Sequence, residues 1–296
     1  MARKIVVAAI QLDAVSVKEK SAKKDKEKVI SRIRDLMEEA AKFNVAIVCM
    51  PELSLTQFFP NSLIHDNDYL FDNLPSPLIE PLIEVAKKHE MVTLLPYAEE
   101  DGDFHYNSCM VFDCDGTVLG KYRKMHIPAY FPSDLPGGTG SYERLYFAPG
   151  NLGFPVFEIK RYGTRVGIQI CADRIFPEGY RVLALKGAEI VFNPTCYGTY
   201  GRADRIPAWG RLLQARAYEN GVFVVAPNKG GTEGIRENAG RSLIISPLSG
   251  ELIKTGPPDG DVIVHAEIDL EDVHEARKKL PWWLWRRPHE YGELMK

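Results

Sequence analysis

Short apolar runs alternate with charged segments of helical period along nearly the whole chain of 296 residues. Residues 5–11 and 45–50 are apolar runs of strand length. Between them, residues 19–42 carry apolar side chains at three- and four-residue spacing, which is typical of an amphipathic helix. The alternation resumes after a stretch rich in proline and glycine, residues 132–150, and no linker divides the chain. This pattern predicts an α/β fold in which both halves contain sheet and helices.

The two half-chains have a similar order of elements, so we expect two sheets face to face with helices outside, a four-layer α-β-β-α sandwich in one domain of residues 1–280. The tail, residues 281–296, differs because it holds three of the four tryptophans together with Arg286 and Arg287. Such side chains need a surface to pack on. We expect a partner subunit to supply it, in a homodimer or larger homo-oligomer. A membrane-interface or nucleic-acid role for the tail is the alternative.

Charge and hydropathy argue against several classes of function. The net charge of -3 gives no basic excess for nucleic acid, and acidic residues interrupt the basic run 18–28, as on a solvated helix face. No run of 18 apolar residues predicts a membrane span. The start, MARKIVVAAIQLDA, has the character of a first strand and not of a signal peptide. Five cysteines without a secretion signal favour the cytoplasm, where a thiol stays reduced, over a disulfide framework.

One cysteine stands where a strand runs into a helix. The run RVGIQI leads directly into Cys171, and a helix is expected to begin near Pro177. At such a turn the helix dipole and free backbone N–H groups favour the thiolate, and the N–H groups can hold an oxyanion. Many cysteines are instead small buried apolar residues. The position predicts a nucleophile at Cys171 and leaves Cys196, near another strand end in NPTC, as its main competitor.

Two charged residues also stand at strand ends, where α/β folds place their sites. Glu52 follows the apolar run VAIVCMP, and in a partly buried cleft its carboxylate would have a raised pKa and act as a general base. Lys124 follows a hairpin, in KYRKMHIP, and could stabilise an oxyanion. Each alone is more often an ordinary surface charge. His126 leaves a Cys–His pair open, but the seven histidines show no close metal-ligand spacing, so we expect no metal.

Together these segments resemble a known family. MPELSLTQFFP, GKYRKMHIP and the run from VGIQICADRIF to FNPT are similar to motifs of the nitrilase superfamily, the carbon–nitrogen hydrolases. The resemblance implies a Glu–Lys–Cys triad of Glu52, Lys124 and Cys171 on a four-layer α-β-β-α sandwich. The segment YERLYFAPG supplies Glu143, which matches a further glutamate that assists near the cysteine. The resemblance also implies hydrolysis of a linear amide through a cysteine thioester, with no metal and no organic cofactor.

Within the superfamily, the stretches ERLYFAPGNLGFPVF, CADRIFPEGYRVLALKGAEI and RRPHEYGEL most resemble the N-carbamoyl-D-amino acid amidohydrolases. In those enzymes two consecutive arginines after the cysteine clamp the substrate's carboxylate. Here Arg174 matches the first, but Ile175 stands in place of the second. Arg202 or Arg205 could replace the missing cation, although both have the character of ordinary surface charges. The resemblance implies a small ureido or amide substrate, first of all an N-carbamoyl amino acid split to amino acid, carbon dioxide and ammonia.

Several alternatives stay open at this point. A β-ureido acid, an N-carbamoyl polyamine such as N-carbamoylputrescine, or a simple aliphatic amide is the runner-up substrate. Asn193, Thr195 and His126 are expected beside the substrate. A nitrile is disfavoured, because true nitrilases usually have tryptophan and glutamate after the cysteine, where this chain has Ala172 and Asp173. A non-catalytic assembly module would be the different class of function, and the intact Glu–Lys–Cys set argues against it.

Overall fold

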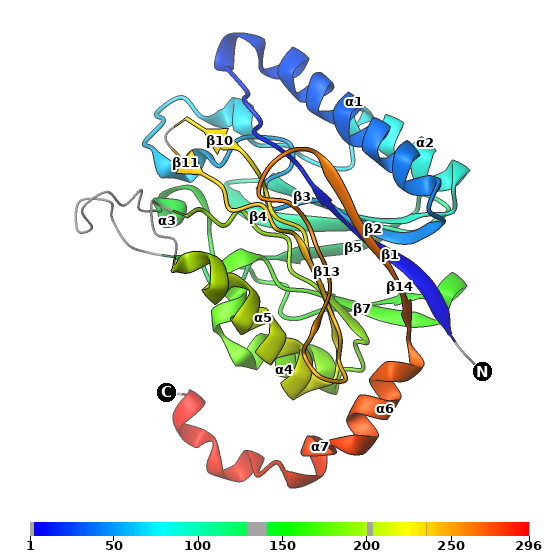
Figure 1. The fold of residues 1–296 in the computed structure, drawn as a ribbon. Helices are drawn as coiled ribbons and strands as arrows, with labels where there is room; N and C mark the ends of the chain where they lie inside the picture. Colours follow the sequence, from blue (N-terminus) through cyan, green and yellow to red (C-terminus); the bar gives the residue numbers. More distant parts are fainter. Residues whose placement is uncertain (1–2, 129–140, 200–203, 235, 296) are drawn as a thin grey trace.

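Two six-stranded sheets lie face to face between two layers of helices, as the sequence predicts (Figure 1). The computed structural model describes residues 3–128, 141–199, 204–234 and 236–295. The first sheet has the order β14-β1-β2-β3-β4-β5 and the second β13-β12-β9-β8-β7-β6. The strands of the two sheets are β1 (Lys4–Gln11), β2 (Val45–Cys49), β3 (Val92–Asp101), β4 (Phe104–Phe112), β5 (Val118–Arg123), β6 (Val156–Ile159), β7 (Thr164–Ile168), β8 (Ile190–Phe192), β9 (Phe223–Ala226), β12 (Leu243–Ile245), β13 (Leu252–Thr255) and β14 (Val262–Asp269).

The two sheets share one plan. Each has three parallel strands at its centre, β1-β2-β3 in the first and β7-β8-β9 in the second, and antiparallel strands on both flanks. This similarity confirms the expectation that the half-chains repeat an order of elements. The helices between the strands are α1 (Ala22–Ala41), α2 (Glu80–Lys88), α3 (Glu143–Tyr146), α4 (Pro177–Leu185) and α5 (Arg205–Asn220), and α6 (Glu271–Lys279) and α7 (Trp282–Trp285) follow the last strand.

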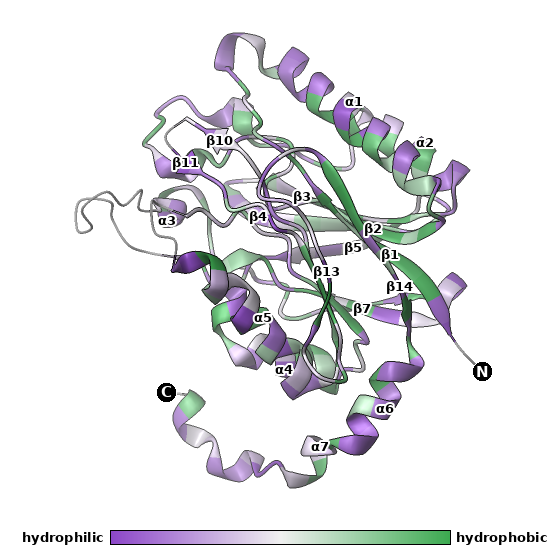
Figure 2. Ribbon diagram, in the orientation of Figure 1, coloured by the Kyte–Doolittle hydropathy of each residue, from purple (hydrophilic) through white to green (hydrophobic). Residues whose placement is uncertain are grey.

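The two-residue alternation of side chains along each strand explains how the layers pack together. Successive side chains of a strand point to opposite faces, so a strand buried on both faces reads as a continuous apolar run. In β1, Val7 and Ala9 join the core between the two sheets, whereas Ala8 and Ile10 pack under α1 and α2. The central strands are accordingly the most hydrophobic part of the chain (Figure 2). On the far side, α4 and α5 cover the second sheet.

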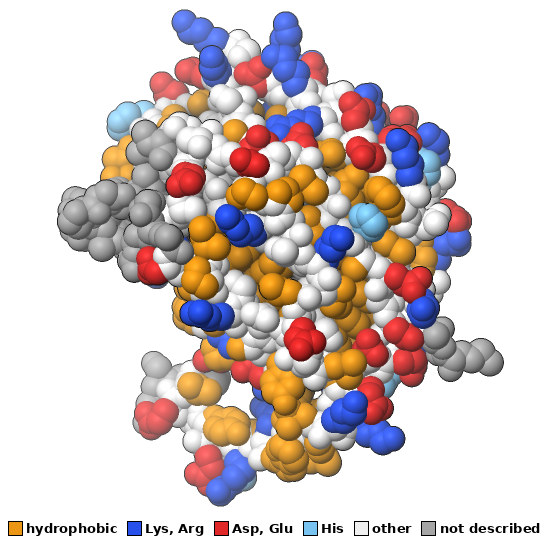
Figure 3. All heavy atoms as spheres, viewed as in Figure 1, with side chains coloured by type: hydrophobic (Ala, Val, Ile, Leu, Met, Phe, Trp, Pro, Cys, Tyr) orange, Lys and Arg blue, Asp and Glu red, His pale blue; other side chains and the backbone are white. Residues whose placement is uncertain are grey.

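The outer helix α1 keeps a charged face in water. Val29, Ile33 and Met37 are buried against the first sheet, and lysines and acidic residues alternate on the opposite side. Figure 3 shows Lys and Arg side chains beside Asp and Glu at this end of the molecule, as on a solvated surface and not as on a basic patch. In the described part of the chain, no helix is both long and apolar enough to cross a membrane.

Two short local features lie outside the predicted pattern. A 3-10 turn at Pro77–Ile79 precedes α2, which begins at Glu80. A short hairpin of β10 (Thr232–Glu233) and β11 (Arg236–Glu237) follows β9 and was not foreseen, because two-residue strands carry no periodic pattern. After α6 the tail curves past α4 and α5 to the C-terminus (Figure 1).

Candidate active site

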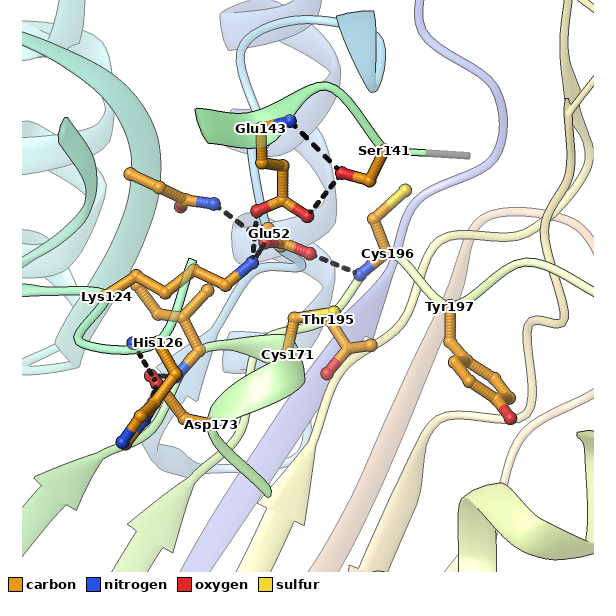
Figure 4. A network of polar contacts seen from close by, with 12 residues as sticks. Glu52, Lys124, His126, Ser141, Glu143, Cys171, Asp173, Thr195, Cys196 and Tyr197 are labelled. Atoms are coloured by element: carbon orange, nitrogen blue, oxygen red, sulfur yellow. Dashed lines mark hydrogen bonds and ion pairs between the residues drawn. The ribbon is translucent and has the colours of Figure 1, made fainter. Parts of the chain in front are cut away.

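Charged and nucleophilic side chains meet at one end of the two sheets. Glu52 follows β2, Lys124 follows β5 directly, and Cys171 stands three residues beyond the end of β7. Glu143 begins the short helix α3. Figure 4 shows all four side chains turned toward one another, together with Ser141 and Cys196. The structure therefore brings together the set of residues that the sequence selected.

The backbone at Cys171 is strained. Its φ of +47° lies in the left-handed region, which costs a residue with a side chain about 1–3 kcal/mol. The amide N–H of Cys171 donates to the Pro194 carbonyl at 2.9 Å, and Cys171 begins a 3-10 helix that ends at Ile175. The α-helix expected near Pro177, α4, begins at that residue. A short 3-10 turn lies between the thiol and the N-terminus of α4.

Lys124 lies at the centre of the cluster. Its ammonium donates to Glu52 Oε1 at 2.8 Å and to Glu143 Oε2 at 2.6 Å, with its side chain fully buried. Burial lowers the pKa of a lysine, but the charges of Glu143 and Glu52 outweigh that effect and hold the pKa of Lys124 well above its usual value. Lys124 is therefore a fixed cation beside the thiol.

Glu52 is surrounded by donors. Besides Lys124, Asn107 Nδ2 donates to Glu52 Oε1 at 2.7 Å, and the amide N–H of Cys196 donates to Glu52 Oε2 at 3.0 Å. Burial raises the pKa of this carboxyl, yet the ion pair with Lys124 and these hydrogen bonds leave the pKa lowered. The sequence suggested a raised pKa for Glu52, and this was wrong because three donors stabilise the carboxylate.

Glu143 is the carboxyl with the raised pKa. Burial is the main cause, and the attraction of Lys124 offsets it only in part, since Glu52 repels a second negative charge. Ser141 Oγ donates to Glu143 Oε1 at 3.0 Å. The two carboxyl groups on one ammonium thus differ in proton affinity, which is the arrangement that separates a base from an acid.

The thiol of Cys171 holds its proton firmly. Burial raises its pKa first, the nearby charge of Glu52 raises it further, and Lys124 and Arg174 oppose both, with a net pKa of about 11. The sequence suggested that the surroundings of Cys171 favour the thiolate, and this was wrong for the resting site. Attack by this sulfur therefore needs a base that removes the proton, and Glu52 is the nearby group that stays ionised.

A cavity of about 280 Å³ opens onto Cys171 and Glu143. Arg174, buried in its wall, places Nη1 3.6 Å from Cys171 Sγ, and its guanidinium lies over the rings of Tyr197 and Trp209. The other described lining residues are Phe58, Pro128, Ser141, Ala172, Ile175, Cys196, Gly198, Arg205, Ala208, Leu212 and Arg236. The wall is therefore mixed apolar and cationic.

Three further residues were expected beside the substrate. Asn193 and Thr195 are fully buried beneath the site, where Asn193 Nδ2 donates to the Gln169 carbonyl and Thr195 Oγ1 donates to Asn193. His126 binds Asp173 and is not part of the cavity wall. The part of the cavity wall that the structure describes does not include these three side chains, so their contact with a substrate stays a prediction.

Of the two candidates for a second cation, Arg205 lines the cavity and Arg202 lies outside the described residues. The Arg205 Nε donates to the Gly198 carbonyl at 3.0 Å, and its guanidinium lies 4.6 Å from the centre of the Tyr197 ring. Ile175, at the position of the missing arginine, is 57% exposed at the cavity rim.

Sequence reasoning missed Asn107, Ser141 and Arg236 as parts of the site. Asn107 is a fully buried amide inside the strand segment YNSCMVF, and a polar residue in a buried strand is a signal that could have found it. Arg236 lies over the Phe58 ring at 4.1 Å and donates to the Asn61 side chain at 2.9 Å. It stands in the short β11 strand, which no pattern predicted.

A buried glutamate–lysine–cysteine cluster at the strand ends of an α-β-β-α sandwich is the arrangement that the resemblance to the carbon–nitrogen hydrolases implied. Comparison with known proteins places the chain among these hydrolases. The sequence profile of the carbon-nitrogen hydrolase family matches residues 6–278, and the chain belongs to this family. It is a carbon–nitrogen hydrolase that acts on amides.

Relatives in sequence and structure agree with this assignment. The chain is 34% identical to an N-carbamoylputrescine amidase of Oryza sativa subsp. japonica over 99% of this chain and 95% of the relative. It is also 34% identical to a citrullinase of Francisella tularensis over 90% of this chain and 92% of the relative. A crystal structure of a carbon-nitrogen hydrolase from Helicobacter pylori G27 superposes with a TM-score of 0.85 at 28% identity, covering 99% of both chains.

Proposed function

We propose that this enzyme hydrolyses the terminal ureido group of a linear compound, R–NH–CO–NH₂, with Cys171 as the nucleophile. The observation that carries the proposal is the buried ammonium of Lys124 between Glu52 and Glu143, next to a thiol that a cavity reaches. Two relatives support the ureido class, because both N-carbamoylputrescine and citrulline end in such a group.

In the first half of the reaction, Glu52 takes the proton of Cys171 as the sulfur attacks the ureido carbon. The developing oxyanion is held by Lys124 and by backbone N–H groups after Cys171, whose fixed positions stabilise charge that forms only in the transition state. The carbon–nitrogen bond then breaks, and the leaving amine or ammonia takes the proton from Glu52. A thioester on Cys171 remains.

In the second half, water attacks the thioester carbon. Glu52 or Glu143 accepts the proton of that water, and the sulfur of Cys171 leaves and is reprotonated. The released carbamate breaks down to carbon dioxide and the second nitrogen product. Glu143 suits proton transfer here because burial raises its pKa above that of an ordinary carboxyl.

The far end of the substrate has two candidates. The relatives favour N-carbamoylputrescine, or a ureido compound of similar length, over the N-carbamoyl amino acid that the sequence motifs implied. Arg174 favours a carboxylate instead, since its guanidinium lies on two aromatic rings and contacts no carboxylate among the described residues. A putrescine ammonium would find only Glu143 among the described acidic side chains of the wall, and Lys124 already binds it.

Ammonia release from a panel of substrates tests both levels of the proposal. The panel holds N-carbamoylputrescine, citrulline, N-carbamoyl-β-alanine, N-carbamoyl-α-amino acids of both hands and a neutral aliphatic amide, with Cys171→Ala as the control. We expect the protein with intact Cys171 to release ammonia from the ureido compounds. Cys171→Ala should release none. Release from the neutral amide alone would contradict the ureido assignment.

The Arg174→Gln variant separates the two candidates. If Arg174 binds a carboxylate, the substitution lowers kcat/KM about 10- to 100-fold on carboxylate substrates and leaves N-carbamoylputrescine unaffected. Arg211→Gln on α5 is the control, because Arg211 is exposed and is not among the described residues that line the cavity. Equal effects on both substrate types would remove the role of Arg174.

We further propose that the tail packs on a second copy of the chain in the cytoplasm. Trp282 lies on the guanidinium of Arg181 at 3.6 Å, whereas Leu284 and Trp285 are 73% and 62% exposed. Trp282 Nε1 and Arg181 Nη1 are buried without a hydrogen-bond partner among the described residues. Light scattering gives the number of subunits for the full chain and for a chain that ends at Leu280. An equal number of subunits for both would contradict the proposal.

A further inference from the structure

One buried carboxylate joins the segment of Lys124 to the segment of Cys171. Asp173 is fully buried and accepts hydrogen bonds from Tyr122 Oη at 2.7 Å and from the Ile170 amide at 2.9 Å. It also accepts from the backbone N–H of His126 at 2.9 Å and from His126 Nδ1 at 2.7 Å. Tyr122 lies in β5, His126 follows β5 and Ile170 follows β7, so a single side chain fixes the end of β5 against the turn after β7.

The His126 ring is held from two directions. Its Nδ1 faces Asp173, and its face stacks on Phe176 with ring centres 3.8 Å apart and planes inclined by 10°. Figure 4 shows His126 beside Asp173 and close to Lys124. Because the acceptor is a carboxylate, Nδ1 must carry the hydrogen. The ring is not part of the cavity wall, so its contacts serve the protein and not the substrate.

We propose that His126 and Asp173 are positioning residues, whose hydrogen bond sets the spacing between the ammonium of Lys124 and the sulfur of Cys171. His126 lies two residues after Lys124, and Asp173 lies two residues after Cys171. Loss of the bond frees the two segments to shift relative to each other. A shift of about 1 Å at a reacting group can cost on the order of 100-fold in rate.

Three substitutions of His126 test this inference. Asparagine places its amide nitrogen where Nδ1 stands and can still donate to Asp173, whereas glutamine places the amide farther out and alanine removes it. We expect His126→Ala and His126→Gln to lower kcat by about 100-fold with KM changed less than about threefold, and His126→Asn to retain most of kcat. The rate of Cys171 alkylation by iodoacetamide should fall in the same order, because Lys124 would no longer stand at its set distance from the thiol.

The control is His265→Ala, which removes another histidine stacked on an aromatic ring, Phe43, at 4.1 Å on a different face of the protein. It should leave kcat and alkylation unchanged. Thermal melting of each variant distinguishes a local shift from unfolding. If His126→Ala fails to fold, the comparison of asparagine with glutamine still decides.

Three results would overturn the inference. Unchanged kcat in His126→Ala would show that the bond is dispensable. A loss confined to KM would make His126 a substrate-binding residue, and equal activities of the asparagine and glutamine variants would remove the role of Nδ1. The rate measurements rest on the proposed function, but alkylation does not. If no amide is turned over, the proposed function fails while the alkylation rates still test the positioning of Cys171.

Discussion

Two lysines of this enzyme are equally buried and both bind glutamate, yet their surroundings differ. Lys124 and Lys229 have fully buried side chains, and their ammonium groups lie 2.8 Å and 2.9 Å from Glu52 and Glu233. Lys229 also donates to the Thr56 carbonyl at 2.6 Å. Around Lys229 one ammonium meets one carboxylate, whereas Lys124 binds a second carboxylate, Glu143, and adjoins the thiol of Cys171.

The difference shows what distinguishes a chemical site from a structural ion pair. Glu233 also accepts hydrogen bonds from the backbone N–H groups of Val15 and Phe58. The Lys229–Glu233 pair therefore connects loops that are far apart in sequence. At Lys124 two carboxyl groups share one cation, and burial together with the repulsion from Glu52 raises the pKa of Glu143. Two carboxyl groups on one buried cation beside a cavity, and not burial of a lysine alone, are what favour the proposed reactive site.

Replacing each lysine by methionine should give the largest difference in kcat between the two sites. Lys124→Met removes the cation that would stabilise the oxyanion, so we expect kcat to fall about 1,000-fold while the protein stays folded. Lys229→Met should leave the kcat of the folded protein within about threefold, since no reacting group contacts Lys229. Steady-state ammonia release at a temperature below both unfolding transitions measures this. Comparable losses in both variants would mean that the two lysines are not functionally distinct.

The free energy of unfolding should fall more in Lys229→Met than in Lys124→Met, which is the opposite order to the effect on kcat. Lys229→Met leaves Glu233 buried without its cation, and removing one partner of a buried ion pair costs about 3–5 kcal/mol. At Lys124 the loss is smaller, because the two glutamates can share a proton once the cation is gone. Urea unfolding followed by circular dichroism gives both free energies. A larger loss in Lys124→Met than in Lys229→Met would contradict this account.

Glu143→Gln tests the contribution of the second carboxyl group at Lys124. Glutamine keeps the hydrogen bond to Lys124 but cannot exchange a proton, so we expect a loss of about 100-fold in kcat. The matched Glu233→Gln should change kcat little, because Glu233 only holds loops together. Single-turnover rates for thioester formation and hydrolysis would show which half of the reaction needs Glu143. An active Glu143→Gln enzyme would refute a role in proton transfer.

The last comparison concerns the reactivity of the Cys171 thiol in the two lysine variants. A pKa of about 11 means that Cys171 is protonated at neutral pH, and the thiolate fraction rises about tenfold per pH unit below that value. Alkylation of Cys171 should therefore accelerate up to about pH 11. Lys124→Met should slow it further, since Lys124 lowers this pKa. Lys229→Met should not. A rate that levels off near pH 7 would mean that the thiolate forms without a base.

Much of the fold could be predicted from the sequence because period and burial are local. The continuous apolar run of β1 and the spaced apolar side chains of α1 encode the layers directly. The Glu52, Lys124 and Cys171 cluster could be predicted from motifs at strand ends. Its proton affinities could not, because they depend on contacts such as that between Lys124 and Glu52, which are 72 residues apart. The same is true of Asp173, which binds both Tyr122 in β5 and the Ile170 amide after β7.

The most direct test of the central claim is mass spectrometry of the enzyme quenched during turnover of a ureido substrate. The account predicts a covalent carbonyl fragment of the substrate on the peptide that contains Cys171, accumulating further in Glu143→Gln and absent from Cys171→Ala. An adduct on Cys196, or turnover by Cys171→Ala, would contradict it.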